Sequence, residues 1–357
     1  MAKGEDVRAA IDYCYKKGWA SDGLPVVPPT PEHVQEFLDC AERDPDEIVV
    51  TMEPIHRKCS VEKAAINAVM AGCLPEYFPT ILSALEAMED DRYNFHGSTA
   101  STGSCAPLLI INGPICQRLG VNSGINVFGP GFRPNATIGR TIRLIQLNVF
   151  GMYPGTFDQS TQGFPGKYTL CIGENEEESP WEPLHVEKGL PLESDAVTVW
   201  GARSAVQVQQ RRAENPEGVL FTIIDTMCQI SSVQNNRQTA VIMGPEHANL
   251  IARHGWSKAD TKQFLFENSC RPIHSFEQLP TINPEKVNNP KDVKGFVQLG
   301  QTPEDILLVV AGGSNAGVST VLHPWGWRMS SIAGAQPPAG VASMDYVTKE
   351  IPKPKMD

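Results

Sequence analysis

The chain has 357 residues with 41 acidic and 30 basic side chains, a formal net charge of −11, which argues against nucleic acid and anionic membrane surfaces as partners. No apolar run is long enough to cross a bilayer, and the opening residues lack the apolar segment of a signal peptide. The nine cysteines form no C-x-x-C pair, so we expect a reduced, cytoplasmic protein without a structural zinc of the paired-cysteine type.

The first half of the chain alternates between helical and extended patterns. Ser60 is a candidate N-cap for an alanine-rich helix that ends at Gly72, and Asn135 is a candidate N-cap for a later helix. The predicted helices cover residues 5–18, 31–43, 61–72, 75–90 and 136–150. The predicted strands of this half cover residues 47–53 and 108–113.

After about residue 170 the pattern changes. An acidic, proline-interrupted loop is followed by short apolar runs of the kind found in strands buried on both faces. These runs cover residues 196–201, 218–225, 239–244 and 305–313. Two amphipathic helices are predicted between the last two runs. The alternation predicts an α/β protein with two α/β halves, residues 1–190 and 191–357, whose mostly parallel sheets are covered by helices.

Small and hydroxyl-bearing residues crowd into STASTGSCAPLLIINGP (98–114), directly before an apolar run. Small residues let backbone N–H groups approach a ligand, and a thiol adds a nucleophile or a hydrogen-bond donor. Thr102, Ser104 and Cys105 are therefore candidate catalytic residues. The alternative is a packed turn in which Cys105 acts as a small apolar side chain. An extended strand after Cys105 would also keep it too far from Cys116 for a disulfide.

A glycine- and proline-rich loop leads into the helix predicted at 136–150. A helix N-terminus beside an arginine suits a carboxylate or a phosphate. The candidate substrate-binding residues of this segment are Arg133, Asn135, Thr137 and Arg140. The alternative is that the arginines pair with the acids of the protein itself. The phosphate-binding pattern G-x-x-x-x-G-K-[ST] is absent, so no nucleotide or dinucleotide cofactor is expected.

The acidic loop GENEEESPWEPLHVEKG (173–189) contains Glu176, Glu182 and His185. Carboxylates and an imidazole at this spacing can bind a divalent metal or act as a general acid and base. We therefore treat Glu182 and His185 as candidate catalytic residues, and all three as candidate metal ligands. The alternative is a solvated acidic face.

A second glycine loop, AGGSNAG (311–317), follows a predicted strand. Open α/β sheets bind ligands at such positions, so Gly312 and Gly313 are candidate substrate-binding residues. The segment HPWGW (323–327) follows this loop and brings a histidine and two tryptophans.

Several long segments resemble the UGSC-motif proteins, a little-characterised family in which some members carry selenocysteine-Gly-Ser-Cys. The segments include VEKAAINAVMAGCLPEYFP, GINVFGPGFRPNATIGRTIRL and PGKYTLCIGENEEESPWEPLHVEKG, and the resemblance covers roughly residues 22–350. Here the motif is Thr102-Gly103-Ser104-Cys105, with threonine at the selenocysteine position. The resemblance implies that the 102–105 loop lines the active centre. A dithiol cycle needs two chalcogens, so this motif alone cannot support one.

The first hypothesis is an enzyme that acts on a small anionic molecule, a carboxylate or phosphate, by nucleophilic or acid–base chemistry of the lyase, hydratase or hydrolase type. The site would lie in a cleft between the halves, where the 102–105 loop, Arg133 and the Glu182–His185 segment face one pocket. A divalent metal stays open as a cofactor, and a homo-oligomer is expected. The second hypothesis is a thiol-dependent oxidoreductase that uses another cysteine for resolution. The third is a non-catalytic ligand-binding or assembly subunit.

Overall fold

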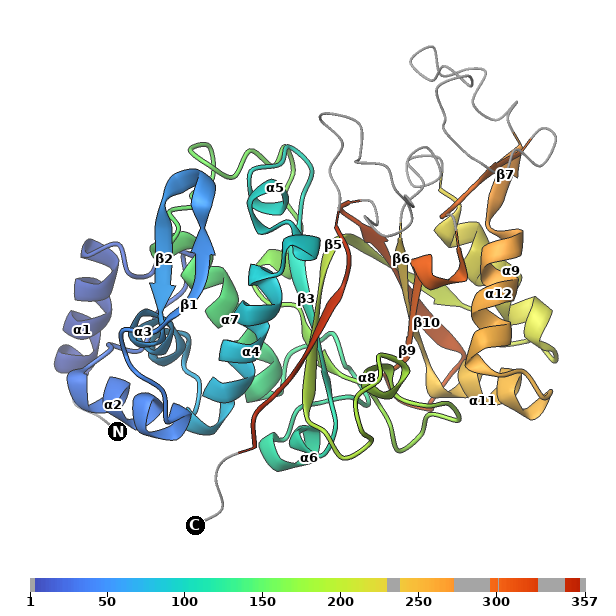
Figure 1. Cartoon of the computed structure of the whole chain (residues 1–357), viewed down its shortest axis with the longest axis horizontal. Helices are drawn as coiled ribbons and strands as arrows, with labels where there is room; N and C mark the ends of the chain where they lie inside the picture. The colour runs from blue at the N-terminus through green and yellow to red at the C-terminus, as the bar shows by residue number, and fades with distance from the viewer. Residues whose placement is uncertain (1–3, 230–237, 273–295, 301, 327–343, 354–357) are drawn as a thin grey trace.

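The computed structural model describes residues 4–229, 238–272, 296–300, 302–326 and 344–353. Trp327, the last residue of the HPWGW segment, lies outside these ranges. Figure 1 shows a curled sheet in the middle of the molecule with one group of helices on each side. The α/β class predicted from the sequence is confirmed. None of the helices in the described ranges combines the length and apolar character that a membrane span requires.

The helices follow the predicted positions closely in the first half. They span Gly4–Lys16 (α1), Pro31–Ala41 (α2), Val61–Ala71 (α3), Phe78–Glu89 (α4), Phe95–Thr99 (α5), Ile115–Leu119 (α6), Arg133–Asn148 (α7), Leu184–Glu187 (α8), Pro216–Met227 (α9), Pro245–Arg253 (α11) and Lys258–Asn268 (α12). Single 3₁₀ turns lie at Glu53–Ile55 (η1), Pro75–Tyr77 (η2), Asp91–Tyr93 (η3), Pro165–Lys167 (η4) and Pro303–Asp305 (η7).

The strands include several that the sequence pattern did not reveal, among them β10 and β11. They span Ile48–Met52 (β1), Arg57–Ser60 (β2), Ala106–Asn112 (β3), Cys171–Gly173 (β4), Ala196–Gln209 (β5), Thr239–Met243 (β6), Cys270–Pro272 (β7), Phe296–Gln298 (β8), Ile306–Val310 (β9), Val318–Pro324 (β10) and Val347–Glu350 (β11).

The ends of α3 form as predicted. The Ser60 hydroxyl accepts a hydrogen bond from the Lys63 backbone N–H at 3.3 Å, which satisfies one free donor of the first turn. Gly72 ends the helix with φ of +87°, a conformation that glycine adopts without strain. The predicted N-cap of α7 is wrong. That helix begins at Arg133 with Phe132 in the N-cap position, so Asn135 lies inside its first turn.

The strand predicted at 218–225 is also wrong, because these residues belong to α9. Asn215 caps this helix by accepting a hydrogen bond from the Gly218 N–H, and Pro216 occupies its first turn. The buried side chains recur with helical spacing rather than with the alternation of a strand. They are Pro216, Val219, Leu220, Ile223, Ile224 and Met227.

The main sheet has seven strands in the order β4-β3-β5-β10-β6-β9, with β11 added beside β5. The pairs β3–β4 and β6–β9 are parallel. The other four described pairings of this sheet are antiparallel, so the prediction of mostly parallel strands is corrected to a mixed sheet. The unpredicted strand β10 accounts for two of these pairings, since it lies between β5 and β6 and runs antiparallel to both. The other two join β5 to β3 and to the unpredicted strand β11.

Each face of the sheet buries a different set of apolar side chains, as strand alternation requires. On one face, Leu108 and Ile110 join Trp200 and Ile242 in a shared central cluster. On the other face, side chains of β3 and β5 pack against α3, α4 and α7, and those of β6 and β9 pack against α9, α11 and α12. The outer face of the sheet therefore carries two separate helical layers (Figure 1).

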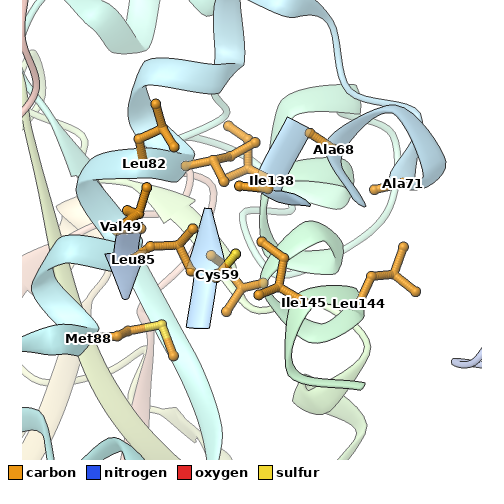
Figure 2. Close-up of a cluster of buried hydrophobic side chains, with 14 of the residues drawn as sticks. Val49, Cys59, Ala68, Ala71, Leu82, Leu85, Met88, Ile138, Leu144 and Ile145 are labelled. Atoms are coloured by element: carbon orange, nitrogen blue, oxygen red, sulfur yellow. The ribbon is translucent and has the colours of Figure 1, made fainter. Parts of the chain in front are cut away.

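Figure 2 shows part of the first helical layer. Leu82 and Leu85 from α4, Ile138 and Ile145 from α7 and Cys59 from β2 converge in a cluster of buried side chains. Burial of apolar area at about 25 cal/mol per Å² makes such a layer a large favourable term in folding. It gives α7 and the loop after it a rigid base.

Candidate functional site

The TGSC loop, residues 102–105, lies between α5 and β3 and is fixed by two hydrogen bonds. The Thr102 carbonyl accepts a hydrogen bond of 2.9 Å from the Thr161 N–H. The Gly103 N–H donates to the Ser101 hydroxyl at 3.0 Å. Thr102 is exposed, whereas Ser104 and Cys105 are buried. The loop therefore presents a threonine to solvent and turns its thiol inward.

The Cys105 thiol lies in a buried setting with two nearby charges. Burial raises its pKa to about 12, against the smaller effects of the Lys167 charge and a hydrogen bond with Ser98, which lower it. The Asp158 charge raises the pKa further. The group is therefore a neutral thiol near pH 7, able to donate a hydrogen bond but not a resting thiolate nucleophile. Sequence reasoning did not identify Asp158 or Lys167 as its neighbours.

Asp158 is the centre of a compact charge cluster. Its Oδ2 accepts from the Lys167 ammonium at 2.6 Å and from the Arg143 guanidinium at 3.1 Å. Its Oδ1 accepts from the Ser160 N–H at 3.0 Å, and Lys167 also donates to the Ser160 hydroxyl at 2.7 Å. Burial alone would raise the pKa of Asp158, but the hydrogen bonds from Lys167 and Ser160 and the Lys167 charge hold it down at about 2. The carboxyl is thus ionised between two cations.

A pocket of about 410 Å³ opens beside this cluster, and Arg143, Lys167 and Asp22 line it. This volume is typical of a site for a small molecule. Asp22 is bound by Arg140, with Arg140 Nε donating to Asp22 Oδ2 at 2.7 Å. Counting these ion pairs, three cations face two carboxylates, so the pocket region carries a net positive charge within a protein of net negative charge.

Arg133 and Arg140 of α7 form hydrogen bonds within the fold. Arg133 donates to the backbone carbonyls of Gly72 at 3.0 Å and Cys73 at 3.4 Å, at the C-terminal end of α3. Arg140 binds Asp22 and the carbonyls of Leu24 and Pro25. Both arginines therefore fasten α7 to earlier segments. The anion-binding role predicted for Arg133 and Arg140 has no contact here that supports it.

Asn135 and Thr137 also bond within the fold. The Asn135 side chain accepts from the Asn122 N–H at 2.8 Å and donates to the carbonyls of Asn122 and Cys171. The Thr137 hydroxyl donates to the Arg133 carbonyl one turn earlier, at 2.8 Å. Asn135 thus joins the loop at residue 122 to β4.

His185 lies in a second polar cluster at the other end of β3. Asn112, the last residue of β3, donates to Glu174 at 2.6 Å and to Glu176 at 2.9 Å. His185 Nδ1 is 3.8 Å from Glu176 Oε1. The seven residues of β3 span roughly 20 Å, so this cluster and the TGSC loop lie at opposite ends of the strand. Glu182 is exposed, and its carbonyl accepts from Lys258.

This buried polar cluster contains unsatisfied acceptors. The Asn112 Oδ1, Glu174 Oε1 and His185 Nδ1 atoms are buried without a hydrogen-bond partner. His185 Nε2 faces the Leu192 carbonyl at 3.2 Å, which assigns the proton of a neutral ring to Nε2. Burial raises the pKa of Glu174, which favours its protonated form. Within the described ranges, no group of three or more His, Cys, Asp or Glu side chains is arranged to hold a metal ion.

The second glycine loop faces a smaller pocket of about 190 Å³, lined in part by Gly312, Gly313 and Ser319. The Gly312 N–H donates to the Ser123 carbonyl at 2.8 Å, and the Gly312 carbonyl accepts from Asn175 at 3.2 Å. Gly312 has φ of +110°, so a side chain there would strain the backbone. The loop at the end of β9 is thus bonded to the segment between α6 and α7 and to the residues that follow β4.

No protein-family model matches the chain, and no curated protein matches it. The geometry therefore carries the functional argument. It brings the TGSC loop together with Asp158, Ser160 and Lys167, and it separates that loop from His185. The sequence offered little to find this set, because Asp158 and Lys167 lie in a segment with no α-helix and no strand of the main sheet and reach Cys105 only through the fold.

Proposed function

We propose that the protein is an enzyme that acts on a small organic anion by acid–base chemistry beside the TGSC loop. The observation that carries this proposal is the position of Lys167. This side chain lines a pocket of ordinary ligand size, binds the Asp158 carboxylate and influences the Cys105 thiol. Arg143 adds a second cation that shares the same carboxylate.

The chemistry follows from the competition for the two cations. A substrate carboxylate or phosphate would draw Lys167 and Arg143 away from Asp158, and this would remove the hydrogen bonds that hold the pKa of Asp158 down. Asp158 would then be a stronger base, and the Lys167 ammonium and the Cys105 thiol are proton donors. A carboxylate base beside two proton donors suits the elimination, hydration or hydrolysis of a small anion.

The resemblance to UGSC-motif proteins supports the choice of the TGSC loop as the active centre. It favours redox chemistry less, because Thr102 replaces one of the two chalcogens. A resolving cysteine would have to lie close to the Cys105 thiol. The groups that influence the pKa of Cys105 are Lys167, Ser98 and Asp158, none of which is a cysteine. Cys73, by contrast, influences the pKa of Cys171. The proposal therefore places acid–base chemistry before thiol oxidation.

The test is binding and turnover with a panel of small carboxylates and phosphate esters. Isothermal titration would measure binding, and proton NMR in D₂O would detect product or exchange of a substrate C–H. We expect at least one panel member to bind and react, and Lys167→Met to lose both activities. Lys16→Met is the matched control, because Lys16 is exposed in α1. Unchanged binding in Lys167→Met overturns the site, and binding without any turnover or exchange favours a ligand-binding protein.

A further inference from the structure

Strand β5 contains a β-bulge at Arg203. On β10, Pro324 pairs with Ala202 and His323 pairs with Ser204, so Arg203 is the extra residue. Ala202 belongs to the central cluster of the sheet, as does Leu322, which pairs with Ala205. The alternation of β5 therefore skips one position, and Arg203 and Ser204 both face the outer side. Bulges of this kind redirect side chains and occur often beside active sites.

The bulge is held by a histidine. His323 Nδ1 is 3.2 Å from the Ser204 hydroxyl, and its Nε2 is 3.1 Å from the Thr226 carbonyl in α9. Because a carbonyl only accepts, the Nε2 carries the proton and Nδ1 accepts from Ser204. Burial lowers the pKa of His323, and the Arg203 charge lowers it further. A neutral imidazole thus links the bulge to the second helical layer.

Within the described ranges, Arg203 is a cation without a counter-charge. Arg140 and Arg143 each bind a carboxylate, whereas among the described residues no carboxylate pairs with Arg203. Its side chain is half-buried, and burial lowers the pKa of the guanidinium. Removing a charge from water without pairing it is unfavourable, so the fold retains this arginine at a cost.

The bulge lies beside the TGSC loop. A Cβ placed on Gly201 would be 2.9 Å from Cys105 Sγ, so Gly201 and the thiol share one face of the sheet. Arg203 is the next outward position on β5, roughly 7 Å along the strand. Trp325 lies in the same region, since its backbone N–H donates to the Gly201 carbonyl at 3.0 Å. Cys105 therefore has Lys167 among its neighbours and Arg203 further along the same face.

We propose that Arg203 binds a second oxyanion of the substrate, which makes the substrate class a small dianion such as a dicarboxylate. One acidic group would meet Lys167 and Arg143, and the other would meet the guanidinium on the bulge. This inference rests on the proposed function for the first of these contacts. His323 and Ser204 are positioning residues that hold Arg203 in the bulge.

The test compares succinate with butyrate, which has the same carbon count and a single carboxylate, by isothermal titration. We expect the wild-type protein to bind succinate about tenfold or more tightly than butyrate, because a charge-assisted pair contributes at this scale. Arg203→Met should bind both ligands equally, and Arg203→Lys should recover part of the preference. Arg212→Met, at an exposed arginine after the same strand, should keep the full preference. Thermal denaturation of each variant checks that it is folded.

The outcomes separate this inference from the proposed function. A succinate preference that survives Arg203→Met overturns the role of Arg203, while Lys167-dependent binding of butyrate would leave the proposed function intact. Loss of the preference in Arg203→Met together with unchanged binding in Lys167→Met would retain Arg203 as an anion site and overturn the proposed function. Absence of a preference in the wild-type protein overturns the dianion assignment.

Discussion

Asp158→Asn tests the charge cluster most directly, because it keeps the shape of the side chain and removes its charge. The pKa of Asp158 falls from an ordinary 3.8 to about 2 in the folded protein. At roughly 1.4 kcal/mol per pKa unit, this fall corresponds to about 2 kcal/mol of folding free energy. We therefore expect Asp158→Asn to lose about 2 kcal/mol of unfolding free energy near neutral pH.

The sign of the pH dependence follows from the lowered pKa. The contribution of Asp158 is complete above about pH 5 and disappears as the pH falls through 4 towards 2, where the carboxyl becomes protonated in both states. The difference in unfolding free energy between the wild-type protein and Asp158→Asn should therefore shrink between pH 5 and pH 3. Urea denaturation at several pH values measures it.

The same variant should bind anions more tightly. Without Asp158, the side chains of Arg143 and Lys167 have no carboxylate to share, so phosphate meets less competition. A ligand stabilises the folded state according to its affinity, and added phosphate should restore more stability to Asp158→Asn than to the wild-type protein. Asp46→Asn, at an exposed aspartate, is the control. Equal stability at pH 7, or an equal response to phosphate, would refute the reasoning.

Three further predictions concern buried groups. Burial raises the pKa of Glu174, so the wild-type protein loses stability as the pH rises above 4.5 and the carboxyl ionises. Glutamine does not ionise. The melting temperature of Glu174→Gln minus that of the wild-type protein should therefore increase from pH 5 to pH 8. Gly201→Ala should lose about 1–3 kcal/mol in denaturation experiments because its Cβ would meet the Met344 side chain and the Cys105 thiol, whereas Gly103→Ala, with no contact closer than 3.5 Å, should be nearly neutral. Iodoacetamide at pH 8 should label Cys105, with its pKa of about 12, far more slowly than the half-buried Cys40 by peptide mass spectrometry; equal rates would contradict the burial argument.

Local signals in the sequence predicted the helices of the first half, because their caps are set by neighbouring residues. Ser60 and Gly72 mark the ends of α3 with contacts inside the same segment. The strand β10 was missed because nothing in VSTVLHP distinguishes a short strand from a loop without its partners. The run GVLFTIID was wrongly predicted to be a strand because its β-branched residues favour strands. The Asn215 cap and the packing of α9 select a helix instead.

The candidate site could be predicted only in part. The residues of the TGSC loop were identified from their small side chains, and the loop contacts the charged cluster through Thr102 and Thr161. Arg133 was visible as a cation at the start of a helix, but its acceptors are carbonyls 60 and 61 residues earlier. Arg203 gave no signal at all, because a bulge depends on the register between two strands that are distant in the sequence.

The pairing of β5 with β11 has a consequence for synthesis on the ribosome. The Thr198 and Thr348 hydroxyls lie 2.7 Å apart across these strands, although 150 residues separate them in the chain. At about 5–20 residues per second, roughly 8–30 s pass before β11 follows β5 out of translation. During that time the first four residues of β5 present an unpaired edge beside α4 (Figure 1). The strand near residue 350 therefore covers this edge only late in synthesis. A chain stalled before that point exposes a surface prone to aggregation.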